Sequence, residues 1–217
     1  MLEFIRMLTD YFLGKTGRGM LFTIGFIITF LVAFGLNLIP FFGPSNLLIA
    51  STAAIGLVNA DPIALLTIAF LIALAAALAK GIHYLITFFV SGHLSEKNQK
   101  RLDLEAGKIR RWAFLLLYIA AATPIPDEPI VIPLGLMKYS PPKFFLSYFL
   151  GKITITVAGA FLGGWVETHF SGLLSPIEMI AISIALTIII TVIMFKVDVG
   201  KETDKIIKKL KGNKTNK

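Results

Sequence analysis

Four ionisable side chains lie within otherwise apolar stretches, and their types allow them to bind or move charged groups. Lys80 and Lys152 each lie inside a long apolar segment, and Asp127 and Glu128 lie in the proline-rich run 123–129. One ionisable group at the centre of a bilayer costs about 2.5–3.5 kcal/mol, so four unpaired groups would cost on the order of 10 kcal/mol. We therefore expect the acidic and basic side chains to be paired, hydrated or both.

This set of charges allows two interpretations. In the first, the carboxylates only pair with the lysines and hold the protein together. In the second, the lysines and the positive ends of broken helices attract an anionic group, while the carboxylates bind and release protons or cations. Asn46 lies in a second proline-rich break, 40–46, and His83 lies one turn beyond Lys80, so both are further candidates for substrate binding or transport. A lone histidine near the end of a helix more often simply lies at the membrane interface, and His83 fits that position too.

Five prolines shape the two breaks, and we expect them to form the tips of hairpins. Proline lacks a backbone donor and disfavours helix at the residue before it. Unpaired backbone groups at membrane depth persist only where protein or a water-filled cavity covers them. The breaks therefore predict a polar cavity rather than a lipid-facing surface. The prolines are Pro40, Pro44, Pro124, Pro126 and Pro129.

The composition of the 217-residue chain indicates a membrane protein. Hydrophobic residues make up 56% and charged residues 16%, and the mean hydropathy is +0.79. A soluble domain carries about 25% charged residues, so this chain has too few polar groups to cover a water-facing surface. The absence of cysteine excludes a cysteine nucleophile, a cysteine metal site and a disulfide scaffold. No enzyme motif and no metal-binding spacing is evident, so we expect a non-enzymatic protein without a metal or cofactor.

Apolar segments predict membrane helices, and basic residues predict their orientation. Several segments reach the about 20 residues that a helix needs to cross a bilayer. The segments are Met20–Phe42, Leu47–Val58, Ile63–Val90, Trp112–Ala122, Phe144–Val166 and Leu173–Phe195. Nineteen of the 21 Lys and Arg residues lie near the chain ends, in segment 92–111 or beside the predicted turn Pro141–Pro142. The net charge of +8 therefore fits a membrane surface rather than nucleic acid, and both termini are expected in the cytoplasm.

The predicted fold is an all-α polytopic bundle, a multi-pass protein of the cell membrane. A single transmembrane domain, 20–196, lies between an amphipathic cytoplasmic helix at 1–19 and a basic cytoplasmic tail at 197–217. One net crossing is needed between the cytoplasmic N-terminus and the external Asp61, and a full helix near Met20–Leu36 followed by a first re-entrant hairpin that opens from outside satisfies this parity. The second hairpin, 111–138, opens from the cytoplasm. A crossing helix with one buried lysine follows each hairpin, which predicts an inverted repeat like those of secondary transporters.

The second break and its surroundings resemble the signature of the DedA family, also called the VTT or SNARE-associated domain. The resemblance spans about residues 35–170. It is carried by Thr123-Pro-Ile-Pro-Asp-Glu-Pro-Ile-Val-Ile-Pro-Leu-Gly-Leu, by 144–152, by Phe41-Phe-Gly-Pro-Ser-Asn and by Lys80-Gly-Ile-His-Tyr. It implies two re-entrant hairpins in an inverted repeat, and translocation of polyprenyl phosphate or phospholipid between leaflets. Asn46 stands where bacterial members usually have a glutamate, and Asp127-Glu128 stand where they have arginines. The chain is thus more similar to the archaeal or eukaryotic-type branch, and the bacterial pattern of proton coupling does not carry over directly.

We therefore expect a lipid transporter, a flippase or a scramblase, whose partners are membrane lipids with phosphate-bearing head groups. Proton or cation coupling and a homo-oligomer are compatible with this expectation. Two alternatives stay open: an ion-coupled transporter of small solutes, in which the carboxylates bind a cation, and a non-transporting membrane scaffold, in which the buried charges hold subunits together. The aromatic residues, Tyr148 among them, are expected mostly at the water–lipid boundary.

Overall fold

The computed structural model describes residues 19–40, 43–57, 61–93, 110–124, 126–170 and 172–175, and four pairs of residues between 177 and 189. Every regular element in these ranges is an α-helix, so the prediction of an all-α fold is confirmed for the described residues. Three predicted segments lie wholly or mostly outside them. These are the amphipathic helix at 1–19, the span Leu173–Phe195 and the tail at 197–217.

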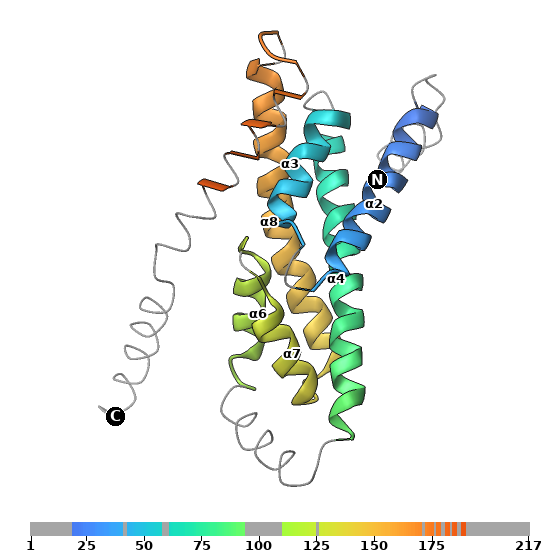
Figure 1. The fold of residues 1–217 in the computed structure, drawn as a ribbon, viewed down its shortest axis with the longest axis vertical. Coiled ribbons are helices and arrows are strands. Elements are labelled where there is room, and N and C mark those ends of the chain that lie inside the picture. The colour runs from blue at the N-terminus through green and yellow to red at the C-terminus, as the bar shows by residue number, and fades with distance from the viewer. Residues whose placement is uncertain are drawn as a thin grey trace, which may run out of the picture.

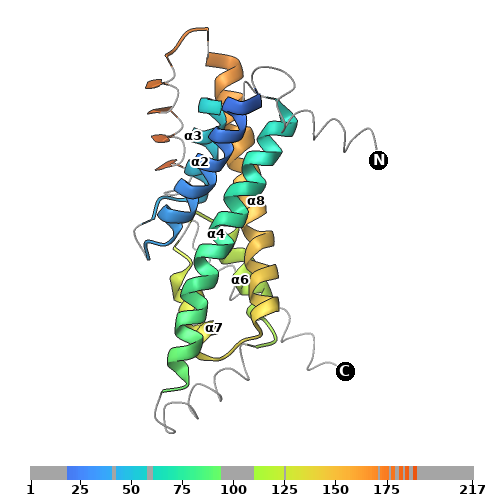
Figure 2. The same ribbon diagram turned by 90° about the vertical axis from the view of Figure 1, so that its right-hand side faces the viewer.

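Two long helices form the frame of the molecule. α4 spans Pro62–Ser91 and α8 spans Pro141–Phe170, with 30 residues each. They run antiparallel along the long axis (Figures 1 and 2), and at 1.5 Å per residue each is about 45 Å long. Both are long and apolar enough to cross a bilayer, which suggests a membrane protein.

Both long helices begin at a proline. In α4, the side chain of Asp61 accepts a hydrogen bond from the Ile63 N–H at 3.3 Å and caps the helix ahead of Pro62. We predicted a turn at Pro141–Pro142, but in the structure these residues form the first turn of α8. Proline is tolerated there because the first N–H groups of a helix have no helical acceptor.

Four shorter helices form two antiparallel pairs. α2 (Gly19–Asn37) pairs with α3 (Asn46–Leu57), and α6 (Ala113–Ala121) pairs with α7 (Glu128–Leu136). The first pair lies at the end of the frame where α4 begins, and the second pair lies at the end where α4 finishes (Figure 1). The turns of the two pairs therefore point toward each other near the middle of the frame (Figure 2).

The two pairs pack on the frame in the same manner. α2 packs on α4 and α3 packs mainly on α8, whereas α6 packs on α8 and α7 packs on α4. In each pair, the first helix contacts the long helix that follows the pair in sequence, and the second helix contacts the other long helix. Each half of the chain therefore contributes to the packing of the other.

The first pair differs from the sequence-based prediction. We expected Met20–Leu36 to cross the whole membrane before a separate hairpin, but α2 is itself the first arm of the pair and ends near the middle of α4 (Figure 2). The amides of Asn37 and Asn46 close the turn, since each donates to the side-chain oxygen of the other, at 2.9 and 3.0 Å. The short turn between these residues leaves no room for another arm. Gly19 thus lies at the same end of the frame as Pro62 (Figure 1), so the direction of α2 contradicts the predicted crossing from the cytoplasm.

A Schellman turn and a tyrosine fix the end of α7 on α4. The N–H groups of Tyr139 and Lys138 donate to the carbonyl oxygens of Leu134 and Gly135, both at 3.0 Å, and Lys138 has a φ of 49°. This is the usual geometry of a helix end, in which glycine normally takes the left-handed position. The hydroxyl of Tyr84 in α4 donates to the carbonyl oxygen of Tyr139. The α6–α7 turn, at the other end of α7, is thereby held at a defined height on the frame.

Glycines let α8 approach the short helices closely. A Cβ atom on Gly159 would lie 2.5 Å from the carbonyl oxygen of Leu47 and 3.0 Å from the Cβ of Ala50, both in α3. A Cβ atom on Gly151 would lie 2.6 Å from the carbonyl oxygen of Tyr118 in α6. Because no side chain fits at either place, these glycines set the positions of α3 and α6 against α8.

Gly159→Ala should therefore destabilise the protein. The added methyl group overlaps the backbone of α3, which must shift at a cost of about 1–3 kcal/mol. Thermal unfolding of the purified protein in detergent measures the change. The control is Gly35→Ala in α2, where a Cβ atom meets nothing within 4 Å. Equal unfolding midpoints for the two variants would contradict the close contact between α3 and α8.

Candidate functional site

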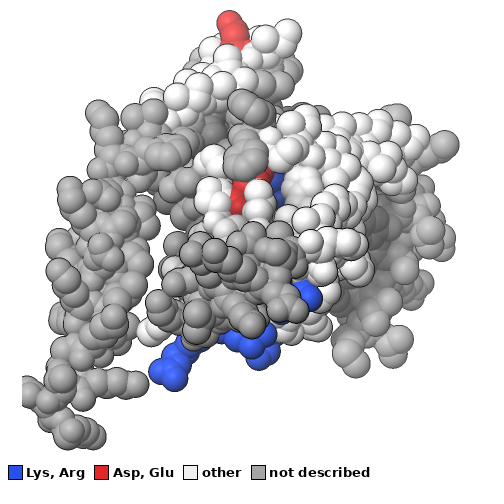
Figure 3. All heavy atoms as spheres, turned by 60° about the horizontal axis from the view of Figure 1, so that its bottom comes forward, with Lys and Arg blue, Asp and Glu red and all other residues white. Residues whose placement is uncertain are grey.

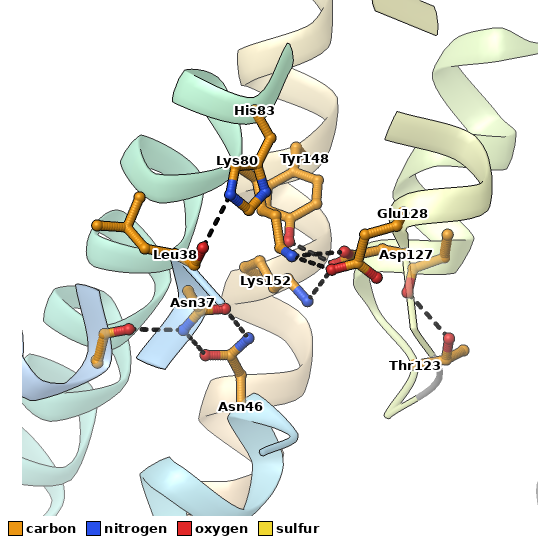
Figure 4. Close-up of polar contacts among 12 residues, drawn as sticks. Asn37, Leu38, Asn46, Lys80, His83, Thr123, Asp127, Glu128, Tyr148 and Lys152 are labelled. Atoms are coloured by element: carbon orange, nitrogen blue, oxygen red, sulfur yellow. Dashed lines mark hydrogen bonds and ion pairs between the residues drawn. The ribbon is translucent and has the colours of Figure 1, made fainter. Parts of the chain in front are cut away.

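The four ionisable side chains come together at one level of the frame (Figure 4). Lys80 lies eleven residues before Ser91, the last residue of α4, and Lys152 lies eleven residues after Pro141, the first residue of α8. Because α4 and α8 are antiparallel, both lysines are about 16 Å from the same end of the frame. The two lysines therefore face the same neighbouring groups.

The turn of the second pair brings the carboxylates to this level. α6 ends at Ala121, and the following prolines, Pro124 and Pro126, keep the chain out of the helix until α7 begins at Glu128. Asp127 directly precedes α7, but its side chain makes no capping hydrogen bond. Aspartate at this position commonly caps a helix. Here the carboxylate of Asp127 forms ion pairs with the two lysines instead.

The four groups form one continuous network of ion pairs. Oδ1 of Asp127 lies 3.5 Å from Nζ of Lys80, and Oδ2 lies 2.8 Å from Nζ of Lys152. Lys80 also donates a hydrogen bond to Oε1 of Glu128. Each of the four side chains is only 5% exposed. Two positive and two negative charges therefore compensate one another, which offsets the cost of burying them.

Tyr148 completes the network and is absent from the sequence-based candidates. Its hydroxyl donates to Oδ2 of Asp127 at 2.5 Å, and Nζ of Lys152 lies 5.0 Å from the centroid of its ring. The tyrosine is fully buried, so the expected position at the water–lipid boundary is wrong. The signal in the sequence is its spacing of four residues from Lys152, which places both side chains on one face of α8.

The opposite wall of the site comes from the turn between α2 and α3. Asn46, a predicted candidate, lies in this wall, and its amide forms hydrogen bonds with the amide of Asn37. Asn37 was not among the candidates predicted from the sequence. Oγ of Ser45 accepts from the N–H of Leu48 at 3.3 Å and caps α3. The described part of this wall is therefore polar and uncharged, in contrast to the wall that holds the ion pairs.

His83 lies beside the uncharged wall and outside the network of ion pairs (Figure 4). Its Nε2 is 3.0 Å from the carbonyl oxygen of Leu38, in the turn after α2. A carbonyl oxygen only accepts hydrogen bonds, so Nε2 carries the proton and donates. The histidine therefore holds the turn against α4.

A cavity lies between the two turns. Its unfilled volume, open mouth included, is ≈ 450 Å³. Eight of the eleven candidates predicted from the sequence line it: Pro44, Asn46, Lys80, Pro124, Pro126, Asp127, Glu128 and Lys152. Pro40, His83 and Pro129 are not among the lining residues, whereas Asn37, Ser45 and Thr123 are lining residues without a prediction. Acidic and basic atoms are visible together in a hollow of the surface (Figure 3).

The site has groups for reversible binding of a charged ligand. Lysine ammonium groups can donate to phosphate oxygens, and carboxylates can accept from an ammonium group or take up a proton. Among the described residues, no three His, Asp or Glu side chains gather in a way that could hold a metal ion. Because the four charges already pair with one another, a charged ligand at this site would exchange partners with the existing ion pairs.

Comparisons with protein-family models, with curated proteins and with solved structures found no significant match. The resemblance to the DedA family thus depends on the sequence motifs alone.

Asp127→Asn and Lys152→Met should each destabilise the protein by about 3–5 kcal/mol, because the first removes the carboxylate beside Lys152 and the second leaves Asp127 with only the more distant ammonium group of Lys80. The double variant removes both charges, so its cost should be smaller than the sum of the single costs by about 1–3 kcal/mol. Unfolding midpoints in detergent give the three values.

Lys143→Met is the matched control for this cycle. Lys143 is an exposed lysine in the first turn of α8, so its loss should leave the unfolding midpoint nearly unchanged. Strictly additive costs for Asp127→Asn and Lys152→Met would show that the two side chains do not stabilise each other.

Proposed function

We propose that the protein moves lipids with phosphate-bearing head groups between the two leaflets of a membrane. The observation that carries the proposal is an open polar cavity whose wall holds a buried, charge-balanced set of ion pairs. A head group would enter this cavity and bind the charges, while the acyl chains stay on the apolar outer faces of the helices. Ile39, which is 47% exposed, lines the same cavity and offers an apolar surface to such a chain.

The outer faces of the helices support a multi-pass position in the membrane. Large apolar side chains are exposed along α2 and α4, including Ile28 and Leu31 on α2 and Ile86 and Phe89 on α4. Soluble monomers rarely expose a continuous apolar surface of this kind. In a bilayer these side chains would face lipid.

The distribution of charge supports an orientation in that membrane. Four of the six described Lys and Arg residues are exposed, and they lie where α4 ends and α8 begins: Arg110, Arg111, Lys138 and Lys143. At the other end, the described charged residues include Asp61 and Glu167 and no lysine or arginine. The positive-inside rule then places the basic end, seen from below in Figure 3, in the cytoplasm.

The short helix pairs suit two re-entrant hairpins in an inverted repeat. α3 has 12 residues, and α6 and α7 have nine each, fewer than the about 20 needed to cross a bilayer. α2 has 19 residues, so its place in a hairpin is supported by its antiparallel pairing with α3 and not by its length. The matching contacts of the two pairs with the frame are those expected of two units with opposite orientation. In transporters of this kind the substrate site lies near the midplane, at broken helices. A cavity between two proline-containing turns suits such a site.

A structural role is the second candidate, because the four charges already satisfy one another. In a scaffold, the ion pairs would hold the helix pairs on the frame and no substrate would cross. An ion-coupled solute transporter would use the same carboxylates for a cation. Each alternative predicts a different result in the same liposome experiment.

Purified protein in liposomes should accelerate the transbilayer movement of fluorescent phospholipid or of labelled polyprenyl phosphate. Asp127→Asn and Lys152→Met should slow this movement by about tenfold or more, since removing one partner leaves a buried charge that must be compensated. Lys143→Met should keep the rate of the unchanged protein. The double variant Asp127→Asn/Lys152→Met provides a second test if a single variant does not fold.

Full rates in folded Asp127→Asn and Lys152→Met variants would remove these residues from the mechanism. Inert liposomes with every head group would favour the scaffold. Solute uptake that follows an ion gradient, without lipid movement, would favour the ion-coupled transporter.

A further inference from the structure

We infer that the cavity selects a zwitterionic head group, which carries both an ammonium group and a phosphate, over a head group with net negative charge. The inference rests on the proposed function and concerns the substrate of that same site. It is carried by the balance and the order of the charges around the cavity.

The charged wall of the cavity has no net charge. The ionisable side chains among its lining residues are two lysines and two carboxylates, Lys80, Lys152, Asp127 and Glu128. The described part of the opposite wall contributes uncharged groups, chiefly the amide of Asn46 and the hydroxyl of Ser45. A ligand with net charge would therefore enter without a matching countercharge, and the desolvation of an uncompensated charge is strongly unfavourable.

The order of the charges matches a ligand that carries both signs. The ion pairs connect Lys152 to Asp127, Asp127 to Lys80 and Lys80 to Glu128, so the signs alternate along the network. When a phosphate binds a lysine, the carboxylate that held this lysine loses one of its positive partners. The ammonium group of a zwitterionic ligand can take that place, so every charge stays paired. An anionic phosphate brings no positive charge in exchange, so the cavity then holds one negative charge in excess unless the carboxylate takes up a proton.

The helix ends at the cavity also have both signs. α3 begins at Asn46 and α7 begins at Glu128, and the N-terminus of a helix carries partial positive charge. α2 ends at Asn37 and α6 ends at Ala121, and a C-terminus carries partial negative charge. Each turn brings one end of each kind to the cavity. The partial charges of the helix ends therefore do not give the cavity a preference for anions.

The test compares labelled phosphatidylcholine with labelled phosphatidylglycerol in liposomes of one composition. These lipids share the glycerol phosphate and the acyl chains. Phosphatidylcholine adds a trimethylammonium group, which pairs with a carboxylate by charge alone because it has no N–H, and phosphatidylglycerol adds an uncharged glycerol with two hydroxyl groups. We expect the unchanged protein to move phosphatidylcholine faster by about tenfold or more, the ratio that one poorly compensated charge produces.

Charge variants should change this ratio in opposite directions. Asp127→Asn gives the cavity one net positive charge and should raise the rate of phosphatidylglycerol relative to phosphatidylcholine. Lys152→Met gives it one net negative charge and should lower that relative rate. Glu128→Gln and Lys80→Met repeat the two changes at the other ion pair, in case the first variants do not fold. Lys143→Met, on the exposed surface, is the control and should leave the ratio unchanged.

Three results would overturn the inference. The first is an unchanged protein that moves phosphatidylglycerol or polyprenyl phosphate as fast as phosphatidylcholine. The second is a set of acidic and basic variants that slow both lipids equally, since a purely structural role changes the rates without changing the ratio. Both results leave lipid transport itself intact. The third is the absence of movement for every lipid, which rejects the proposed function together with its substrate.

Discussion

A carboxylate buried about a third of the way along a helix frame requires positive charge beside it, and the arrangement of this molecule follows from how Asp127 meets that requirement. It takes Lys80 from α4 and Lys152 from α8, so that one side chain ties both long helices to the turn of the second helix pair. The two lysines can share it because they lie at the same level of two antiparallel helices. Tyr148 fills the remaining side of the carboxylate with a hydrogen bond. The same ion pairs that stabilise the frame also make it a site, because buried charges can exchange partners but cannot be left without one.

The sequence is a better guide to which side chains come together than to the directions in which the helices run. The four charges are recognisable because ionisable residues inside apolar segments are rare and costly, and the prolines mark both turns. The direction of α2 is not predictable in this way, since 19 apolar residues can either cross a membrane or turn back within it. The amide pair of Asn37 and Asn46 decides between these outcomes, and it is a tertiary contact. Tyr148 is missed for a similar reason, because a tyrosine near the start of an apolar helix fits the interface as well as it fits a buried hydrogen bond.

In the proposed function, the two walls of the cavity have different roles in binding. The α6–α7 turn and the frame hold the charges, and the α2–α3 turn supplies uncharged polar groups, with Asn46 where the bacterial members of the resembled family usually carry a glutamate. An uncharged wall next to a neutral set of ion pairs keeps the whole cavity near zero net charge. A head group would then gain its binding energy from an exchange of partners rather than from the attraction of a net opposite charge. Salt weakens such an exchange between buried pairs less than it weakens attraction between exposed charges. This account joins the fold, the charge balance and the proposed preference for zwitterionic lipid.

The central claim is that water fills the cavity between the two turns at membrane depth, and single cysteines test it directly because the chain contains none of its own. Ser45→Cys and Thr123→Cys place a thiol on each side of the cavity, and Leu31→Cys and Ile86→Cys place one on the exposed apolar faces of α2 and α4. In intact membranes, a water-soluble, membrane-impermeant thiol reagent should label the two cavity positions and leave the two apolar positions unlabelled. Cavity cysteines as unreactive as those at Leu31 and Ile86 would contradict the account.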